Sequence, residues 1–147
     1  MYYFQTYFID LFQNKYAEFG GRARREEYWY FTLFWLLIII LLGLTGGLGE
    51  TMDIPVLRGL GFGAVMIFVL ASILPYFALI SRRLHDTGKS AWWWLIRFVP
   101  LGPIVLLVFY CLDSERGPNK WGPSPKYNLN DEDEIYDQHL LIDDDLL

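Results

Sequence analysis

Three stretches of the chain are rich in apolar side chains and almost free of charge, and polar segments separate them. The first two, residues 28–48 and 60–80, are each long enough for an α-helix to span the roughly 30 Å of hydrocarbon in a bilayer. The third, residues 92–112, carries the run PLGP at its centre, where two prolines and a glycine interrupt a helix. The pattern predicts an all-α membrane protein with two full transmembrane helices and a third, broken apolar segment.

The broken segment has two interpretations that lead to different topologies. It is either one kinked span or a hairpin of two short helices that turns at PLGP and returns the chain to the side it came from. Lysine and arginine gather in cytoplasmic loops, and the hairpin divides them ten against one, whereas a crossing divides them seven against four. The count therefore favours the hairpin, and both interpretations place the N-terminus in the cytoplasm.

The N-terminal residues 1–18 show a different pattern, in which apolar side chains recur at helical spacing. Phe4, Phe8, Leu11 and Phe12 share one face of a helix, and polar residues occupy the rest of the wheel. This pattern predicts an amphipathic helix lying in the membrane interface. The alternative is a helix whose apolar face packs on a protein partner. The absence of a basic region at the start argues against a signal peptide.

The C-terminal end of the chain accounts for its acidic net charge. Eight of its acidic side chains lie in the last seventeen residues, so that the formal net charge of -5 comes from the tail alone. Residues 113–127 are rich in glycine and proline and predict turns. Residues 128–147 predict a disordered acidic tail. The sequence therefore predicts a membrane domain over residues 1–127 followed by that tail.

Basic side chains gather in three polar segments, residues 20–27, 81–90 and 115–126. These segments would face one compartment if the third apolar segment turns back. Arginine binds phosphate through its planar fork, and basic residues near an anionic leaflet are attracted to it. We therefore expect a polar cluster that binds an anionic lipid headgroup or a partner protein. Its candidate residues are Arg22, Arg25, Arg82, Arg83, His85, Asp86, Asn119 and Trp121.

The chemistry of catalysis is poorly represented in these segments. His85 and Asp86 are adjacent, and adjacent side chains on a helix point about 100° apart, so they do not form a relay by themselves. The sequence has two histidines and one cysteine, Cys111, which predicts no metal site and no cofactor. The chain is expected to be non-enzymatic and to bind membrane lipids, a membrane-protein partner or a second copy, but no nucleic acid.

Two other functions stay open at this stage. A small transporter or channel component would use the PLGP break to line a cavity, although Thr32, Thr45, Ser72 and Arg97 are nearly all the polar residues in the apolar stretches. A membrane enzyme acting on lipid phosphates would use the arginines for phosphate and His85 with Asp86 for proton transfer.

Four motifs together resemble a known family. They are FGGRARREEYW at residues 19–29, RRLHDTGKSAWWW at 82–94, PLG at 100–102 and GPNKWGPSP at 117–125. In this order they are similar to domain-of-unknown-function family eight hundred and five, small bacterial inner-membrane proteins, over roughly residues 16–125. Ala91, where the family often has glycine, and the acidic tail depart from the pattern. The resemblance implies a multi-span helical protein of the cytoplasmic membrane with no assigned reaction or cofactor.

Overall fold

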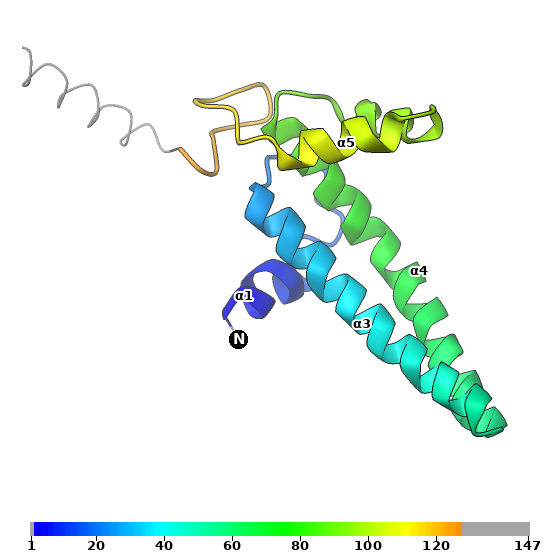
Figure 1. Cartoon of the computed structure of the whole chain (residues 1–147). Coiled ribbons are helices and arrows are strands. Elements are labelled where there is room, and N and C mark those ends of the chain that lie inside the picture. The colour runs from blue at the N-terminus through cyan, green and yellow to red at the C-terminus, as the bar shows by residue number, and fades with distance from the viewer. Residues whose placement is uncertain (1, 128–147) are drawn as a thin grey trace, which may run out of the picture. The chain divides into compact units, whose positions relative to one another are not determined.

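The computed structural model describes residues 2–127, and the predicted acidic tail lies outside the described residues. Within these residues, seven helical elements follow one another: α1 (Tyr2–Phe4), the π-helix η1 (Gln5–Ile9), α2 (Asp10–Gln13), α3 (Arg25–Thr51), α4 (Pro55–Asp86), the 3₁₀-helix η2 (Ala91–Phe98) and α5 (Gly102–Cys111) (Figure 1). These described residues contain no β-strand, only an isolated bridge between Asn119 and Gly122. The expected all-helical architecture is confirmed.

The chain divides into two compact units. Among the described residues, the helical unit combines residues 2–19 with Glu26–Ile80, and the polar unit combines Gly20–Arg25 with residues 81–127.

Helices α3 and α4 are both long and apolar enough to span a membrane. They extend beyond the predicted spans at both ends, and only residues 52–54 join them. The stretch between the spans, expected to be a polar loop, is therefore mostly helical, because glycine and polar residues continue a helix whose backbone bonds are satisfied internally. Asp53, with a φ of 53°, makes the turn.

Small residues bring these two helices together. A Cβ atom on Gly61 would lie 2.2 Å from the backbone nitrogen of Gly46, and one on Gly49 would lie 2.2 Å from the backbone nitrogen of Arg58. Membrane helices lack a hydrophobic driving force for association and rely on such close backbone packing. Further along the pair, the ring of Tyr76 stacks on those of Phe31 and Trp35.

The N-terminal helical segment uses its apolar face within the helical unit. Phe8 stacks on Phe31 with ring centroids 5.2 Å apart, and Phe4 meets Phe34 edge to face. Phe8 and Leu11 are buried. Protein thus covers the face expected to enter lipid, as in the alternative of a packed helix. A position of this segment at the membrane interface stays a prediction.

The same unit accommodates Pro75 in the middle of α4. A proline has no N–H, so the carbonyl four residues earlier, that of Ala71, loses its usual helical partner. The hydroxyl of Tyr16 donates to this carbonyl at 2.8 Å. A side chain from the N-terminal region therefore satisfies the acceptor that the proline leaves open, as backbone groups in lipid require.

The third apolar segment forms two short helices that belong to the polar unit. η2 and α5 contact each other, and residues 99–101 turn the chain between them, with Leu101 in the left-handed conformation at a φ of 65°. Gly102 allows the close approach, because a Cβ atom there would lie 1.6 Å from the carbonyl oxygen of Ile96. We call η2, the turn and α5 the 91–111 hairpin.

Candidate functional site: the Asp86 cluster

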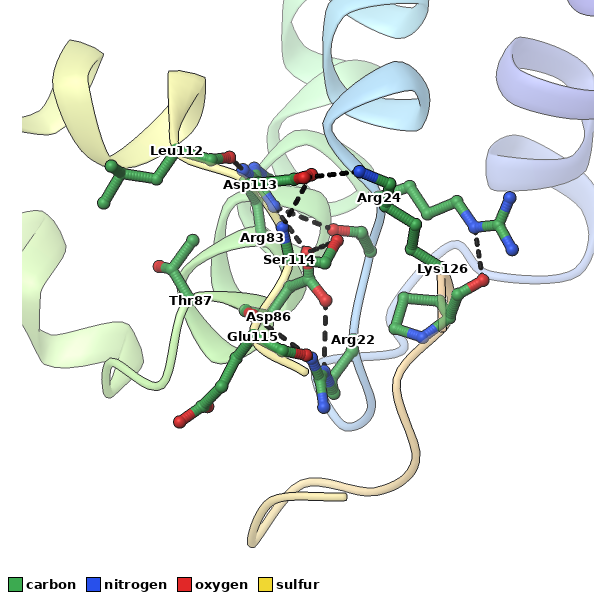
Figure 2. Close-up of polar contacts among 12 residues, drawn as sticks. Arg22, Arg24, Arg83, Asp86, Thr87, Leu112, Asp113, Ser114, Glu115 and Lys126 are labelled. Atoms are coloured by element: carbon green, nitrogen blue, oxygen red, sulfur yellow. Dashed lines mark hydrogen bonds and ion pairs between the residues drawn. The ribbon is translucent and has the colours of Figure 1, made fainter. Parts of the chain in front are cut away.

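The carboxylate of Asp86 lies at the centre of the polar unit and is completely buried. Its Oδ1 accepts from Arg22 Nε at 3.1 Å, and its Oδ2 accepts from Arg83 Nη1 and from the Ser114 hydroxyl, both at 2.6 Å (Figure 2). A buried carboxylate is stable only when donors and opposite charge surround it. We call Arg22, Arg83, Asp86 and Ser114 the Asp86 cluster.

Arg22 joins the segment before α3 to the loop that follows α5. Besides its bond to the carboxylate, it donates to the carbonyls of Asp86, Glu115, Gly117 and Gly122. Its side chain is 1 % exposed. The guanidinium donors are directed at protein acceptors, which leaves this arginine poorly placed to bind a phosphate.

Arg83 has a parallel role at the end of the 91–111 hairpin. It donates to the carbonyls of Tyr110, Leu112 and Ala23 as well as to Asp86. The last carbonyls of a helix have no partner within it and carry partial negative charge. The guanidinium of Arg83 therefore stabilises the C-terminus of α5 and connects it to α4.

The C-terminus of α4 is completed by residues from the other polar segments. The carbonyl of His85 accepts from the Asn119 side-chain amide at 3.0 Å, and the carbonyl of Asp86 accepts from the backbone N–H of Glu115 at 2.9 Å. The last carbonyl of α4 thus meets Arg22, and the last carbonyls of α5 meet Arg83. This electrostatic complementarity explains why arginines, buried and paired, are found here.

His85 forms the second part of the site. Its ring stacks on that of Trp121 with centroids 4.3 Å apart, and the Lys120 ammonium lies 4.1 Å from the Trp121 centroid. His85 Nδ1 lies 3.2 Å from the carbonyl oxygen of Gly21. His85 is 7 % exposed, so its contacts are those of a packed structural residue.

The candidate residues differ in how they enter this site. Arg22, Arg83, His85, Asp86, Asn119 and Trp121 are joined by the contacts above. Arg82 is buried, and its carbonyl accepts from the backbone N–H of Ala23 at 3.0 Å. Arg25 is exposed and has no hydrogen bond or ion pair within the part of the chain that the structure describes.

Sequence reasoning missed Ser114 and the pairs around it. A serine in a polar loop gives no signal, and Ser114 is placed by its bond to Asp86. Beside it, Asp113 accepts hydrogen bonds from Lys126 and from the Tyr127 hydroxyl. The bond from Lys126 is the main cause that holds the pKa of the Asp113 carboxyl well below its usual range. This partly exposed ion pair links the two ends of the loop over residues 113–126.

Comparison with known proteins identifies the family of this chain. The family model described as protein of unknown function (DUF805) matches residues 16–123. The chain belongs to this family. The resemblance drawn from the four motifs is confirmed.

Two curated relatives of this DUF805 chain come from Escherichia coli strain K12. Inner membrane protein YhaI is 41 % identical over 128 residues, which cover 84 % of this chain and 98 % of YhaI. Inner membrane protein YhaH is 37 % identical over 121 residues, covering 82 % of this chain and 96 % of YhaH. No match was found among solved structures. The DUF805 region contains the whole Asp86 cluster and ends before the acidic tail.

Proposed function

We propose that the chain is an integral protein of the bacterial inner membrane, crossed by α3 and α4, with its N-terminus and residues 113–127 in the cytoplasm. Both helices have the required length and composition. YhaI and YhaH are inner membrane proteins. The placement follows the lysine and arginine count. It is supported by the bonds of Arg22 and Arg83, which join segments that a crossing would separate.

The polar unit acts as a non-enzymatic module that binds anionic phospholipid headgroups. The observation that carries this assignment is the division of the cations into two sets. Arg22 and Arg83 are buried and occupied by protein acceptors, so their role is to hold the unit together. Arg25, Arg116 and Lys120 are exposed. The exposed set is free to attract an anionic leaflet, at about 1 kcal/mol for each cation near its surface.

In the loop after α5, two of these cations lie over aromatic rings. Arg116 lies over the Tyr127 ring, 5.4 Å from its centroid, and Lys120 lies over Trp121. Trp121 is itself stacked on His85. Cations held near aromatic rings suit the headgroup region, where aromatic side chains also gather. The module is thus a rigid support for outward-facing basic groups.

The two alternatives receive less support from the site. For catalysis on lipid phosphates, His85 and Asp86 would have to face a substrate, yet both are buried and the Asp86 carboxylate is bonded to three protein donors. For transport, polar groups would have to face a path. The hydroxyls of Thr32, Thr45 and Ser72 instead donate to carbonyls of their own helices. A non-enzymatic module agrees best with these contacts.

Charge removal on the exposed loop tests this function. We expect the double variant Arg116→Gln/Lys120→Gln to fold normally and to co-purify with severalfold less phosphatidylglycerol relative to phosphatidylethanolamine than the wild type, because the loss removes attraction at the headgroup level. Lipid extraction from the detergent-purified protein followed by mass spectrometry gives this ratio.

The control is Arg58→Gln. Arg58 is also exposed and pairs with Glu50 near the turn between α3 and α4, on the side that the proposal places outside the cytoplasm. Its substitution should leave the lipid ratio unchanged. An equal lipid ratio in wild type and the double variant would refute headgroup binding by this loop.

A further inference from the structure

The 91–111 hairpin has features that the proposed function leaves unexplained. Its arms pack through Trp93 and Phe109, whose rings meet edge to face at 5.6 Å. Lys89, just before η2, places its ammonium 4.5 Å from the Phe109 centroid. The hairpin is therefore a defined element of the polar unit. Its residues are mostly apolar, although the segments before and after it are polar.

Both ends of the hairpin are bonded to the last turn of α4. On the entry side, the backbone N–H groups of Gly88 and Lys89 donate to the carbonyls of His85 and Leu84. On the exit side, Arg83 binds the carbonyls of Tyr110 and Leu112. An element whose two ends are bonded to the last turn of one helix starts and finishes on the same side of a bilayer.

The arms are too short to cross. The eight residues of η2, at roughly 2.0 Å of rise per residue in a 3₁₀-helix, extend about 16 Å. The ten residues of α5, at about 1.5 Å per residue, extend about 15 Å. Each arm therefore covers about half of the roughly 30 Å hydrocarbon core. One leaflet is the most that the hairpin can enter.

The surface of the hairpin is apolar along both arms. Residues three apart eclipse each other on a 3₁₀-helix, so Trp92, Leu95 and Phe98 form one line, and the outer two are 77 % and 75 % exposed. On α5, Ile104 and Val108 lie one turn apart on one face and are also exposed. Exposure of these apolar faces to water costs free energy, and contact with lipid removes that cost.

Arg97 limits how deep the hairpin can lie. It is exposed and lies two residues before the turn, so a hairpin entering tip first would carry a charged side chain toward the centre of the bilayer, which is unfavourable. In an orientation parallel to the surface, Arg97 reaches the headgroups while Trp92 and Phe98 contact the acyl chains.

We infer that the 91–111 hairpin lies in the plane of the cytoplasmic leaflet, at the boundary between headgroups and acyl chains, and contacts the membrane in addition to the two spans. This inference rests on the proposed inner-membrane topology, but not on binding of anionic headgroups by Arg116 and Lys120. Its ligand is the phospholipid leaflet itself.

Depth-dependent quenching tests this position in the full chain. The background is Cys111→Ser, because Cys111 is an exposed free thiol. An environment-sensitive fluorophore is attached at Phe98→Cys or Ile104→Cys, with the exposed Pro123→Cys as a control for a site outside the acyl chains. The protein is placed in phosphatidylethanolamine and phosphatidylglycerol vesicles that contain a nitroxide quencher either near the headgroup or near the end of the acyl chain.

We expect both hairpin sites to be quenched severalfold more by the shallow nitroxide than by the deep one, and Pro123→Cys to be quenched less than either of them. Adding Arg97→Leu should shift quenching at Phe98→Cys toward the deep nitroxide. Stronger quenching by the deep nitroxide without that change, or no quenching at either hairpin site, would overturn the inference, the latter pointing to a protein partner or solvent. An unchanged depth in the Arg97→Leu variant would also overturn it.

Repeating the measurement in phosphatidylcholine vesicles separates this inference from the proposed function. Shallow quenching there, combined with an unchanged lipid ratio in the Arg116→Gln/Lys120→Gln variant, would support the hairpin position while refuting selective headgroup binding. A change in that lipid ratio without quenching at the hairpin would support headgroup binding and refute the hairpin position.

Discussion

Replacement of Asp86 by asparagine is expected to lower the free energy of unfolding by about 3 to 5 kcal/mol. The substitution keeps the size of the side chain but removes the negative charge shared by Arg22 and Arg83. Two buried guanidinium groups would then lack their counter-charge, which is more costly than the loss of the hydrogen bonds alone. Chemical unfolding of the purified protein in detergent micelles measures the change.

The matched control is Asp113→Asn. Asp113 also forms an ion pair, with Lys126, but its side chain is 43 % exposed, and solvent screens such pairs. Its substitution should change stability little. If the Asp86→Asn protein unfolded at the same denaturant concentration as the wild type, the Asp86 cluster would not be what holds the three polar segments together.

Gly61→Leu is expected to destabilise the helical unit by at least about 3 kcal/mol, the upper end of the usual cost of overpacking. Even a Cβ atom at this position would lie 2.2 Å from the backbone nitrogen of Gly46, and a backbone atom cannot move aside as a side chain can. The helices α3 and α4 would have to separate near their connecting turn. Thermal unfolding in detergent, followed by circular dichroism, reports the loss.

Gly63→Leu provides the comparison, since a Cβ atom at Gly63 meets nothing within 4 Å. Both substitutions add the same apolar side chain to the same helix, two residues apart. We expect only Gly61→Leu to lower the unfolding temperature. Equal unfolding temperatures for the two variants would show that close packing at Gly46 and Gly61 is not required.

The apolar runs predicted much of the fold because bilayer thickness sets the length of a span. They did not predict where α3 and α4 end, since helix ends depend on capping and packing contacts. The pattern of Phe4 and Phe8 shows an apolar face but not what covers it. In the structure, the aromatic rings of α3 cover that face.

The sequence predicted which types of residue gather at the candidate site, but not which partner each of them contacts. Because arginine suits both phosphate and buried carboxylates, the sequence alone could not separate the buried Arg22 and Arg83 from the exposed Arg25. That distinction depends on the carbonyls at the ends of α4 and α5, which only the folded backbone brings together. Ser114 was missed for the same reason, since its importance comes from its distance to Asp86.

The most direct test of the central claim, that the three polar segments lie on one side of the membrane around Asp86, is the location of residues 113–127. Fluorescent-protein and alkaline-phosphatase reporters fused after Lys126 measure it, with fusions after Asp53 as the opposite-side control. We predict fluorescence without phosphatase activity after Lys126, and phosphatase activity without fluorescence after Asp53. Phosphatase activity after Lys126 would place the loop that contains Ser114 across the membrane from Asp86 and contradict the claim.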